Sequence, residues 1–466
     1  MSFQEAVDCN ALEATTSIEE ITEDELNRDI LRYLKNDELY TLWLCRPGLA
    51  TECGERYQLH SYELGSSREL YWLGHFAKKS TSPDSVGIFG VGTFGNCSGH
   101  SVDRFFDDLC KCNHIKKMHF DGTDLAEIID KLDGAMKSSN FTHFVVEECH
   151  LGVPEATFLF DAFGLMNSLE DLIIDCEEEG GVLANLNDGD MADCIPSLAA
   201  CSGMRSLKLN YLNLSTNSCA ALRGVFPRMA NLRDLVLCGN SFDDDCTRLL
   251  AQGLSDCKQM QSLNLSHNRI SDNGLNALVQ RLPASVDALY LERNDITLAR
   301  HVLLQCNIGD EGTATLADGL RNNQRLTDMS LGGNNITERG WNALSSILCD
   351  TSSINATYNS NHALQHLGYY RIPQDVEMML RLNKDKSKSH VAANKILQSH
   401  PHLDMRPLFG RELGLLPHVV AWLEHFAKSR LDLKLSSIFE FVRAMPMKVA
   451  DGVVGMTEGE KRKLNN

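Results

Sequence analysis

The sequence lacks the features that would place the protein in a membrane or outside the cell. No apolar run approaches the roughly 18–20 residues needed to cross a bilayer. The N-terminus, MSFQEAVDCNALEATTSIEE, has neither the basic start nor the apolar stretch of a signal peptide, and its acidity argues against a mitochondrial presequence. We therefore expect a cytoplasmic or nuclear protein that is not secreted and has no membrane partner.

Positive charge is also scarce. The chain has 44 Lys and Arg against 63 Asp and Glu, a formal charge of -19, which repels phosphate backbones and opposes non-specific nucleic-acid binding. A protein partner, basic or of mixed charge, is expected instead of nucleic acid. The 16 cysteines of this 466-residue chain are expected to be reduced thiols, because a long chain without a secretory leader has little use for a disulfide framework.

Familiar catalytic and metal motifs are missing as well. No G-x-S-x-G, P-loop or HExxH pattern occurs in the sequence. Cys110, Cys112 and His114, and the adjacent Cys149 and His150, offer zinc-ligand types, but no second pair at suitable spacing completes a tetrahedral set. These thiols are expected in the core. We predict no catalytic residue, no metal site, no cofactor and no small-molecule substrate.

The chain does contain a repeat. Apolar residues at relative positions 1, 4, 6 and 11, with Asn at position 9, give L-x-x-L-x-L-x-x-N-x-I. The good copies start at Leu232, Met260, Val286 and Leu326, with Asn240, Asn268, Asn294 and Asn334 at position 9, and weaker copies start at Val86, Ile115, Phe141, Leu169, Met204 and Ile354. The Asn amides are expected to bond turn backbone of adjacent units.

The period of the repeat determines which element comes after each strand. Most successive starts differ by 26–29 residues, and two intervals are 35 and 40. A period near 28 leaves room for a full helix after each strand. Apolar residues at helical spacing mark that helix independently, as in Cys246, Leu250 and Leu254.

This pattern resembles the leucine-rich repeats of ribonuclease-inhibitor-like proteins. The resemblance covers about residues 86–364 and implies an α/β fold, a right-handed βα leucine-rich-repeat solenoid (horseshoe) with helical caps at both ends. We expect an acidic N-terminal capping region over 1–85, about ten solenoid units over 86–364, and a helical C-terminal region with a flexible tail over 365–466. Solenoids of this class include inhibitors, GTPase activators, sensors and adaptors, so the resemblance is weak as to function.

The same architecture weakens one apparent motif. Gly90-Val-Gly-Thr-Phe-Gly95 matches GxGxxG after an apolar run and before an expected helix, with Asp121 at the end of another strand. Every unit of the solenoid is a strand, a turn and a helix, so the repeat supplies this context and cannot confirm a nucleotide site.

Two intervals break the period, and the ends differ from the repeats. The surplus at 297–308 is either a protruding loop or an error in the sequence, and EEEGGVLANLNDGDMAD is an acidic loop candidate. A Thr22/Glu25 capping box should open a helix over 22–35. The segments from Trp72 and Trp422 share six of seven residues and are expected to be similar capping helices. Further helices are expected at 374–382, 390–398, 417–428 and 435–445.

Variable positions 3, 5, 7 and 8 of each unit should project from the concave face of the sheet, where aromatic and charged side chains make interface anchors. We predict a non-enzymatic scaffold that binds a protein there, with Glu147, Glu148 and Asp175 attracting a basic partner. The alternatives are a GTPase-activating protein and an enzyme inhibitor. The predicted binding residues are His143, Glu147, Glu148, Asp175, Lys208, Tyr211, His267, Tyr290, Glu292 and Arg293.

Overall fold

The computed structural model describes residues 9–138, 140–178, 181–182, 184–294, 308–321, 323–368, 372–385 and 387–400. The chain divides into two compact units. The first comprises Met1–Ile308 with Ser330–Asn335, and the second comprises Gly309–Met329 with Ile336–Asn466. No helix in the described part of the chain combines the length and apolar character that a membrane span requires.

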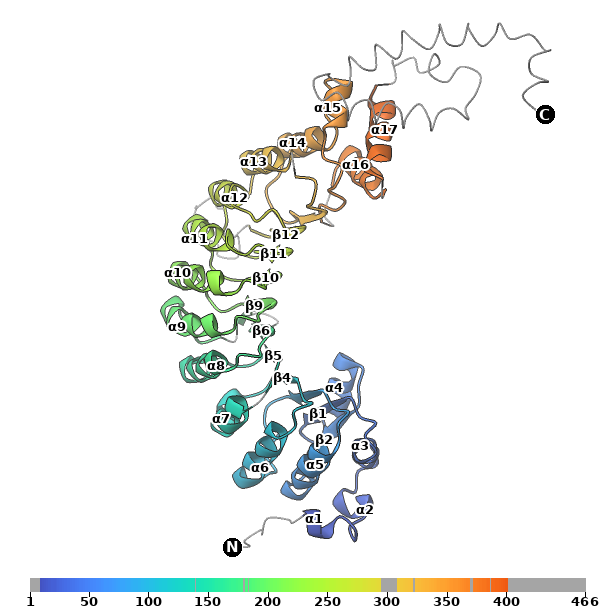
Figure 1. Ribbon diagram of the computed structural model, residues 1–466, viewed down its shortest axis with the longest axis vertical. Helices are drawn as coiled ribbons and strands as arrows, with labels where there is room; N and C mark the ends of the chain where they lie inside the picture. Colours follow the sequence, from blue (N-terminus) through green and yellow to red (C-terminus); the bar gives the residue numbers. More distant parts are fainter. Residues whose placement is uncertain are drawn as a thin grey trace, which may run out of the picture. The chain divides into compact units, whose positions relative to one another are not determined.

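A parallel sheet forms the centre of the first unit (Figure 1). Its strands lie in register, so that Leu207, Leu235, Leu263 and Leu289 form one fully buried row. The predicted α/β repeat is confirmed. In spatial order the strands are β2 (Ser61–Glu63), β1 (Thr41–Cys45), β3 (Ser85–Phe89), β4 (Lys117–Asp121), β5 (His143–Glu147), β6 (Asp171–Asp175), β9 (Ser206–Asn210), β10 (Asp234–Val236), β11 (Ser262–Asn264) and β12 (Ala288–Tyr290).

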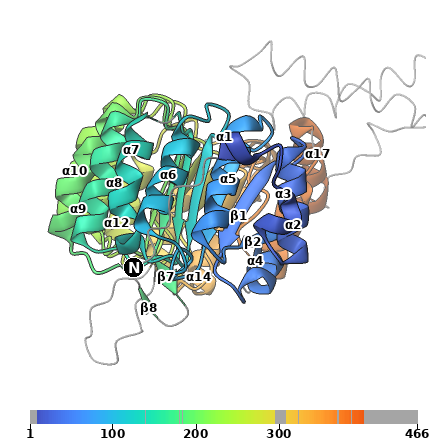
Figure 2. The ribbon, with the colours of Figure 1, turned by 90° about the horizontal axis from the view of Figure 1, so that it is seen from below.

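One helix comes after almost every strand, and these helices stack side by side along one face of the sheet (Figures 1 and 2). Leu222, Leu250 and Leu278 are fully buried, as the predicted register requires. The helices on this face are α5 (Ser67–Lys79), α6 (Gly99–Cys110), α7 (Ile129–Ser138), α8 (Val153–Leu165), α9 (Asp188–Cys194), α10 (Thr216–Val225), α11 (Asp244–Leu254) and α12 (Asp272–Val279).

The repeated asparagines connect adjacent units, as predicted. The Asn268 amide nitrogen donates to the carbonyl oxygens of Leu237, Leu265 and Ser266 at 3.0–3.1 Å, and its oxygen accepts from the Phe242 amide at 3.1 Å. Asn240, Asn294 and Asn334 repeat the bonds to preceding carbonyls. Each amide thus satisfies buried turn backbone that the parallel ladder leaves unpaired.

The sheet begins before the first repeat predicted at residue 86. The sequence also predicts a possible first strand with Leu39, Leu42 and Leu44, and β1 contains Leu42 and Leu44. Strands β1 and β2 pair with each other, and β1 pairs with β3. Because β1 lies between β2 and β3, the chain places β2 on one side of β1 and then returns to place β3 on the other side. Crossovers between parallel strands are right-handed, so the reversal places α4 (Ala50–Tyr57) on the face opposite α5.

The outer edge of β2 is closed by a side chain. The Asn27 amide nitrogen donates to the Glu63 carbonyl at 2.8 Å, and the Asn27 oxygen accepts from the Glu63 amide at 2.9 Å. This pairing imitates a further strand and protects the edge. Asn27 lies on α3 (Glu25–Lys35), the predicted helix. Its N-cap is Asp24 rather than Thr22, because the Asp24 carboxylate accepts a hydrogen bond from the backbone N–H of Asn27.

Smaller elements complete the first unit. The acidic segment after β6 contains a short hairpin and then α9, so it is more ordered than the predicted loop. The additional elements are α1 (Cys9–Leu12), α2 (Ile18–Ile21), β7 (Glu177–Glu178), β8 (Gly181–Val182) and the 3-10 turns Leu125–Glu127, Ile195–Ala200 and Phe226–Arg228. Trp72 is buried within α5, while its echo at Trp422 lies outside the described residues.

The second unit is mainly helical. The predicted unit starting at Ile354 is wrong: residues Ile354–Tyr358 form a helix, and the bridge to Asp328 is made by His366. The helices expected at 374–382 and 390–398 are present, whereas 417–428 and 435–445, like most of 297–308, fall outside the described residues. The elements are α13 (Asp310–Leu320), β13 (Asp328–Ser330, divided between the units), α14 (Glu338–Leu348), α15 (Ile354–Tyr358), α16 (Gln374–Asn383) and α17 (Lys388–Ser399).

Candidate functional site

The candidate site is the face of the first unit's sheet that lies opposite α6–α12, which we call the open face. Strand register arranges its side chains in three rows. The first row is His143, Asp171, Ser206, Asp234 and Ser262; the middle row is Val145, Ile173, Lys208, Val236 and Asn264; the third row contains Glu147, Asp175 and Asn210.

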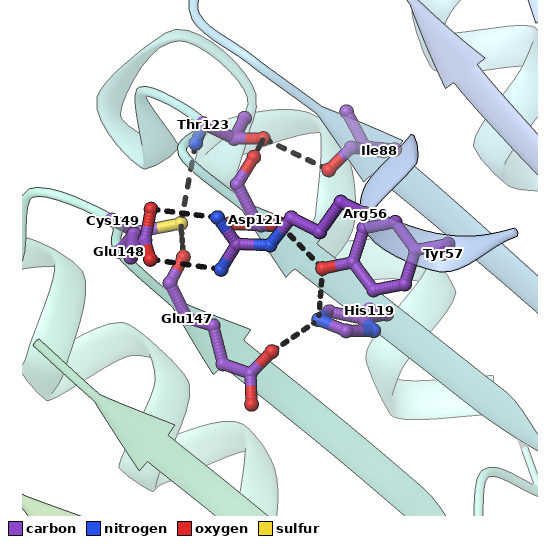
Figure 3. A network of polar contacts seen from close by, with 9 residues as sticks. All are labelled: Arg56, Tyr57, Ile88, His119, Asp121, Thr123, Glu147, Glu148 and Cys149. Carbon is purple, nitrogen blue, oxygen red and sulfur yellow. Dashed lines mark hydrogen bonds and ion pairs between the residues drawn. The ribbon is translucent and has the colours of Figure 1, made fainter. Parts of the chain in front are cut away.

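At the β1 end, the open face is covered by the last turn of α4 (Figure 3). The Arg56 guanidinium bridges two strands: its Nε lies 2.9 Å from Asp121 Oδ2, and its two terminal nitrogens lie 2.8 and 2.9 Å from the two oxygens of Glu148. The Asp121 side chain is fully buried and that of Glu148 is exposed. A single arginine therefore ties α4 to the end of β4 and to the turn after β5.

Tyr57 extends this contact with an aromatic ring. Its ring stacks on Trp43 of β1 at 4.0 Å between centroids, and its hydroxyl donates to Asp121 Oδ2. Trp43 can lie flat on the sheet because residue 87 is glycine: a Cβ there would meet the indole at 2.4 Å. His119 packs edge-on to both rings. Arg56 thus holds α4 by ion pairs to Asp121 and Glu148, and Tyr57 holds it by an aromatic stack and a hydrogen bond.

Burial and pairing set the charges of this cluster. Burial raises the pKa of the Asp121 carboxyl, although Tyr57 and Arg56 oppose the rise. Its Oδ1 atom has no hydrogen-bond partner among the described residues. The hydrogen bond from His119 at 3.0 Å lowers the pKa of Glu147. The guanidinium of Arg56 and the hydrogen bond from His119 therefore make these buried or half-buried carboxylates tolerable.

The predicted acidic patch is brought together, but two of its three members are already paired. Glu148 binds Arg56 and Glu147 binds His119, whereas Asp175 accepts from the Asn210 amide at 3.0 Å. Within the patch, Asp175 is therefore the one carboxylate that neither an Arg nor a His contacts among the described residues. The attraction of the patch for a basic partner stays a prediction.

The remaining predicted residues lie on the same face. Tyr211, His267 and Arg293 all have left-handed backbone, with φ of 54, 57 and 47°, which turns them onto the rim at the strand ends. Gly239 makes room for one of them, because a Cβ there would meet the Tyr211 ring at 2.3 Å. Burial lowers the pKa of His267. The other four predicted residues are half-buried and lie on the open face or its rim: His143, Lys208, Tyr290 and Glu292.

Sequence reasoning missed the residues of α4. His119 and Asp121 could have been found, because they occupy positions 5 and 7 of the unit that starts at Ile115. Arg56 and Tyr57 carried no such signal. Their place depends on the reversed strand order at β1, β2 and β3, which no local pattern specifies.

The apparent nucleotide and zinc motifs are engaged internally. Thr93 of the glycine loop donates to the Phe89 and Gly90 carbonyls, and Asp121 is held by Arg56. The Cys110 and Cys112 thiols donate to backbone carbonyls of α6. Across the described ranges, no group of three or more His, Cys, Asp or Glu could hold a metal ion.

No family model matches the chain. The chain is 30% identical over 194 residues to mouse ribonuclease inhibitor, covering 36% of this chain and 41% of that protein. It is 26% identical to mouse NACHT, LRR and PYD domains-containing protein 4E, covering 40% of this chain and 17% of that protein. The chain thus spans less than half the length of these curated relatives. A Listeria monocytogenes internalin structure aligns at TM-score 0.35 and 15% identity, over 70% of this chain and 95% of that one.

The repeat motif, the in-register strands and the asparagine bonds define a leucine-rich-repeat protein. Within that class, its repeats are of the ribonuclease-inhibitor-like kind, with a helix after each strand, in agreement with the similarity to mouse ribonuclease inhibitor.

Proposed function

We propose that this protein is a non-enzymatic scaffold that binds a partner protein on the open face. The observation that carries the proposal is the partial exposure of Val145, Ile173 and Val236 on a rigid sheet. Apolar side chains in a row, flanked by polar ones, are typical of interaction sites. The repeat helices α6–α12 lie on the other face, and no described helix covers this row.

The charge of the face supports a basic partner. Asp171, Asp175 and Asp234 are half-buried, and the structure gives none of them a Lys or Arg within ion-pair distance among the described residues. Burial raises the pKa of Asp234; the positive charge of Lys208 opposes this rise, and the neighbouring Asp171 adds to it. A cation supplied by a partner would relieve this repulsion.

Affinity capture with two matched variants tests the proposal. Asp175→Lys/Asp234→Lys reverses two charges on the open face and leaves the Arg56 contacts intact. Asp161→Lys/Asp245→Lys reverses two exposed charges on α8 and α11 and is the control. We expect a partner that is retained by the wild type and the control but lost by the open-face variant. Equal retention by all three would contradict the proposal.

Enzyme inhibition is a second candidate, favoured by the similarity to mouse ribonuclease inhibitor. It predicts that the purified chain slows RNA hydrolysis by a basic ribonuclease at a stoichiometric ratio. Unchanged hydrolysis would remove this candidate while leaving the scaffold proposal in place.

A further inference from the structure

The three rows of the open face differ in chemistry. Between β5 and β10 the middle row consists of Val145, Ile173, Lys208 and Val236. The first row supplies Asp171 and Asp234, and the third row supplies Glu147 and Asp175. This stripe, apolar except for Lys208, crosses four adjacent strands and is therefore bordered by carboxylates on both sides.

The spacing of the stripe favours a particular backbone. Neighbouring strands lie about 4.8 Å apart, so the stripe from β5 to β10 is about 14 Å long. A helix laid across the strands advances about 5.4 Å per turn and presents about one apolar residue to each strand over nearly three turns. An extended peptide returns a side chain to the same face only about every 6.6 Å, which does not match.

The last turn of the chain's own helix α4 also contacts this face. It places Tyr57 against Trp43, the middle-row residue of β1, and Arg56 against Asp121, the third-row residue of β4. An aromatic ring on the middle row and a guanidinium on the acidic row are thus an observed way for a helix to bind here. From β5 to β10 the same rows continue, and no described helix covers them.

We infer that the partner presents a basic amphipathic α-helix, which lies across β5 to β10 with apolar residues on Val145, Ile173 and Val236 and with Lys or Arg on the bordering carboxylates. The inference rests on the proposed function and specifies the partner's binding element.

A designed peptide tests the inference with a defined probe. The probe is a labelled peptide of about four helical turns, built of Leu and Lys with leucines at helical spacing, and its comparator has the same composition in strict alternation. Fluorescence anisotropy with the full chain should give roughly tenfold or tighter binding of the helical pattern, a difference of about 1.4 kcal/mol. Equal affinity for the two peptides, or no binding of either, would overturn the inference.

Protein variants show where the peptide binds. Ile173→Gln/Val236→Gln removes the stripe, and we expect it to weaken binding by roughly tenfold or more. Asp171→Asn/Asp234→Asn removes two negative charges from the open face, and we expect it to weaken binding. Asp161→Asn/Asp245→Asn removes two negative charges from helices on the opposite face of the sheet, and we expect no effect on binding. Unaltered affinity of the stripe variant would overturn the inference. If the affinity capture described above still yields a partner that the open-face variant loses, the scaffold proposal stands and only the inference of a helical binding element is rejected.

Discussion

Arg56 offers a strong test of how the open face is built. Arg56→Met keeps the aliphatic stem but removes the charge that pairs with the fully buried Asp121. Breaking a buried ion pair by removing one partner costs about 3–5 kcal/mol. Because 37% of the Arg56 side chain is exposed, water screens part of this charge, and the exposed contact with Glu148 adds little. We expect a loss of about 2–3 kcal/mol in the free energy of unfolding at neutral pH.

The loss should depend on pH in a definite direction. Without Arg56, the pKa of Asp121 in the folded protein rises further above its unfolded value, since burial already raises it. The folded variant then binds a proton more readily than the unfolded chain. Its stability therefore falls as pH rises from the unfolded pKa of about 3.9 through the folded pKa. The difference from wild type should be smallest in acid and largest near neutral pH.

Urea unfolding followed by circular dichroism measures this effect. Arg56→Met/Asp121→Asn should recover part of the loss, because the uncompensated charge is removed. Arg223→Met, an exposed arginine whose guanidinium donates to Gln252, is the control and should cost less than about 0.5 kcal/mol. Equal losses for Arg56→Met and the control, or a loss that grows in acid, would refute the reasoning.

Three further changes test the repeat and the second unit. Gly239→Ala should cost about 1–3 kcal/mol by thermal unfolding, because φ is +67° and the new methyl meets the Tyr211 ring. Asn268→Ala should cost about 3 kcal/mol or more, since several buried backbone groups lose their partner. Lys395 is buried on carbonyl oxygens, and burial lowers its pKa to about 7; the wild type should therefore gain stability between about pH 7 and 10, and Lys395→Met should lose that gain.

Each of these changes has a matched control. Gly224 lies in α10 with nothing near its Cβ direction, so Gly224→Ala should be neutral or stabilising by about 0.5–1 kcal/mol. Asn273 is exposed, and Asn273→Ala should cost less than about 0.5 kcal/mol. Lys384 is exposed, and Lys384→Met should keep the wild-type pH profile. If a control variant changes stability, or its pH profile, as much as the variant it is matched to, the contact proposed for that variant does not account for the effect.

The repeated part of the fold was predictable because its signals are local and periodic. Leucine spacing defines each strand and helix, and Asn268 and its counterparts occur where turn backbone needs a partner. The strand order at the start of the sheet was not predictable in this way. The order of β2, β1 and β3 is set by tertiary packing, and it alone places α4 on the open face.

The candidate site was predictable only as a set of outward-facing positions. Strand alternation identified Glu147, Glu148 and Asp175, but their partners lie far away in sequence. Arg56 is 92 residues from Glu148. The sequence also did not show that Tyr211 requires glycine at residue 239, because that contact joins a side chain of one repeat to the turn of the next repeat.

Site-specific photo-crosslinking tests the central claim most directly. A photoreactive phenylalanine is placed at Val236 on the open face or at Gln252, which is exposed on α11, and cell lysate is irradiated with each purified protein. The account predicts that one partner protein crosslinks to the residue-236 probe and not to the residue-252 probe. A partner that crosslinks only from residue 252, or equally from both, would contradict binding on the open face.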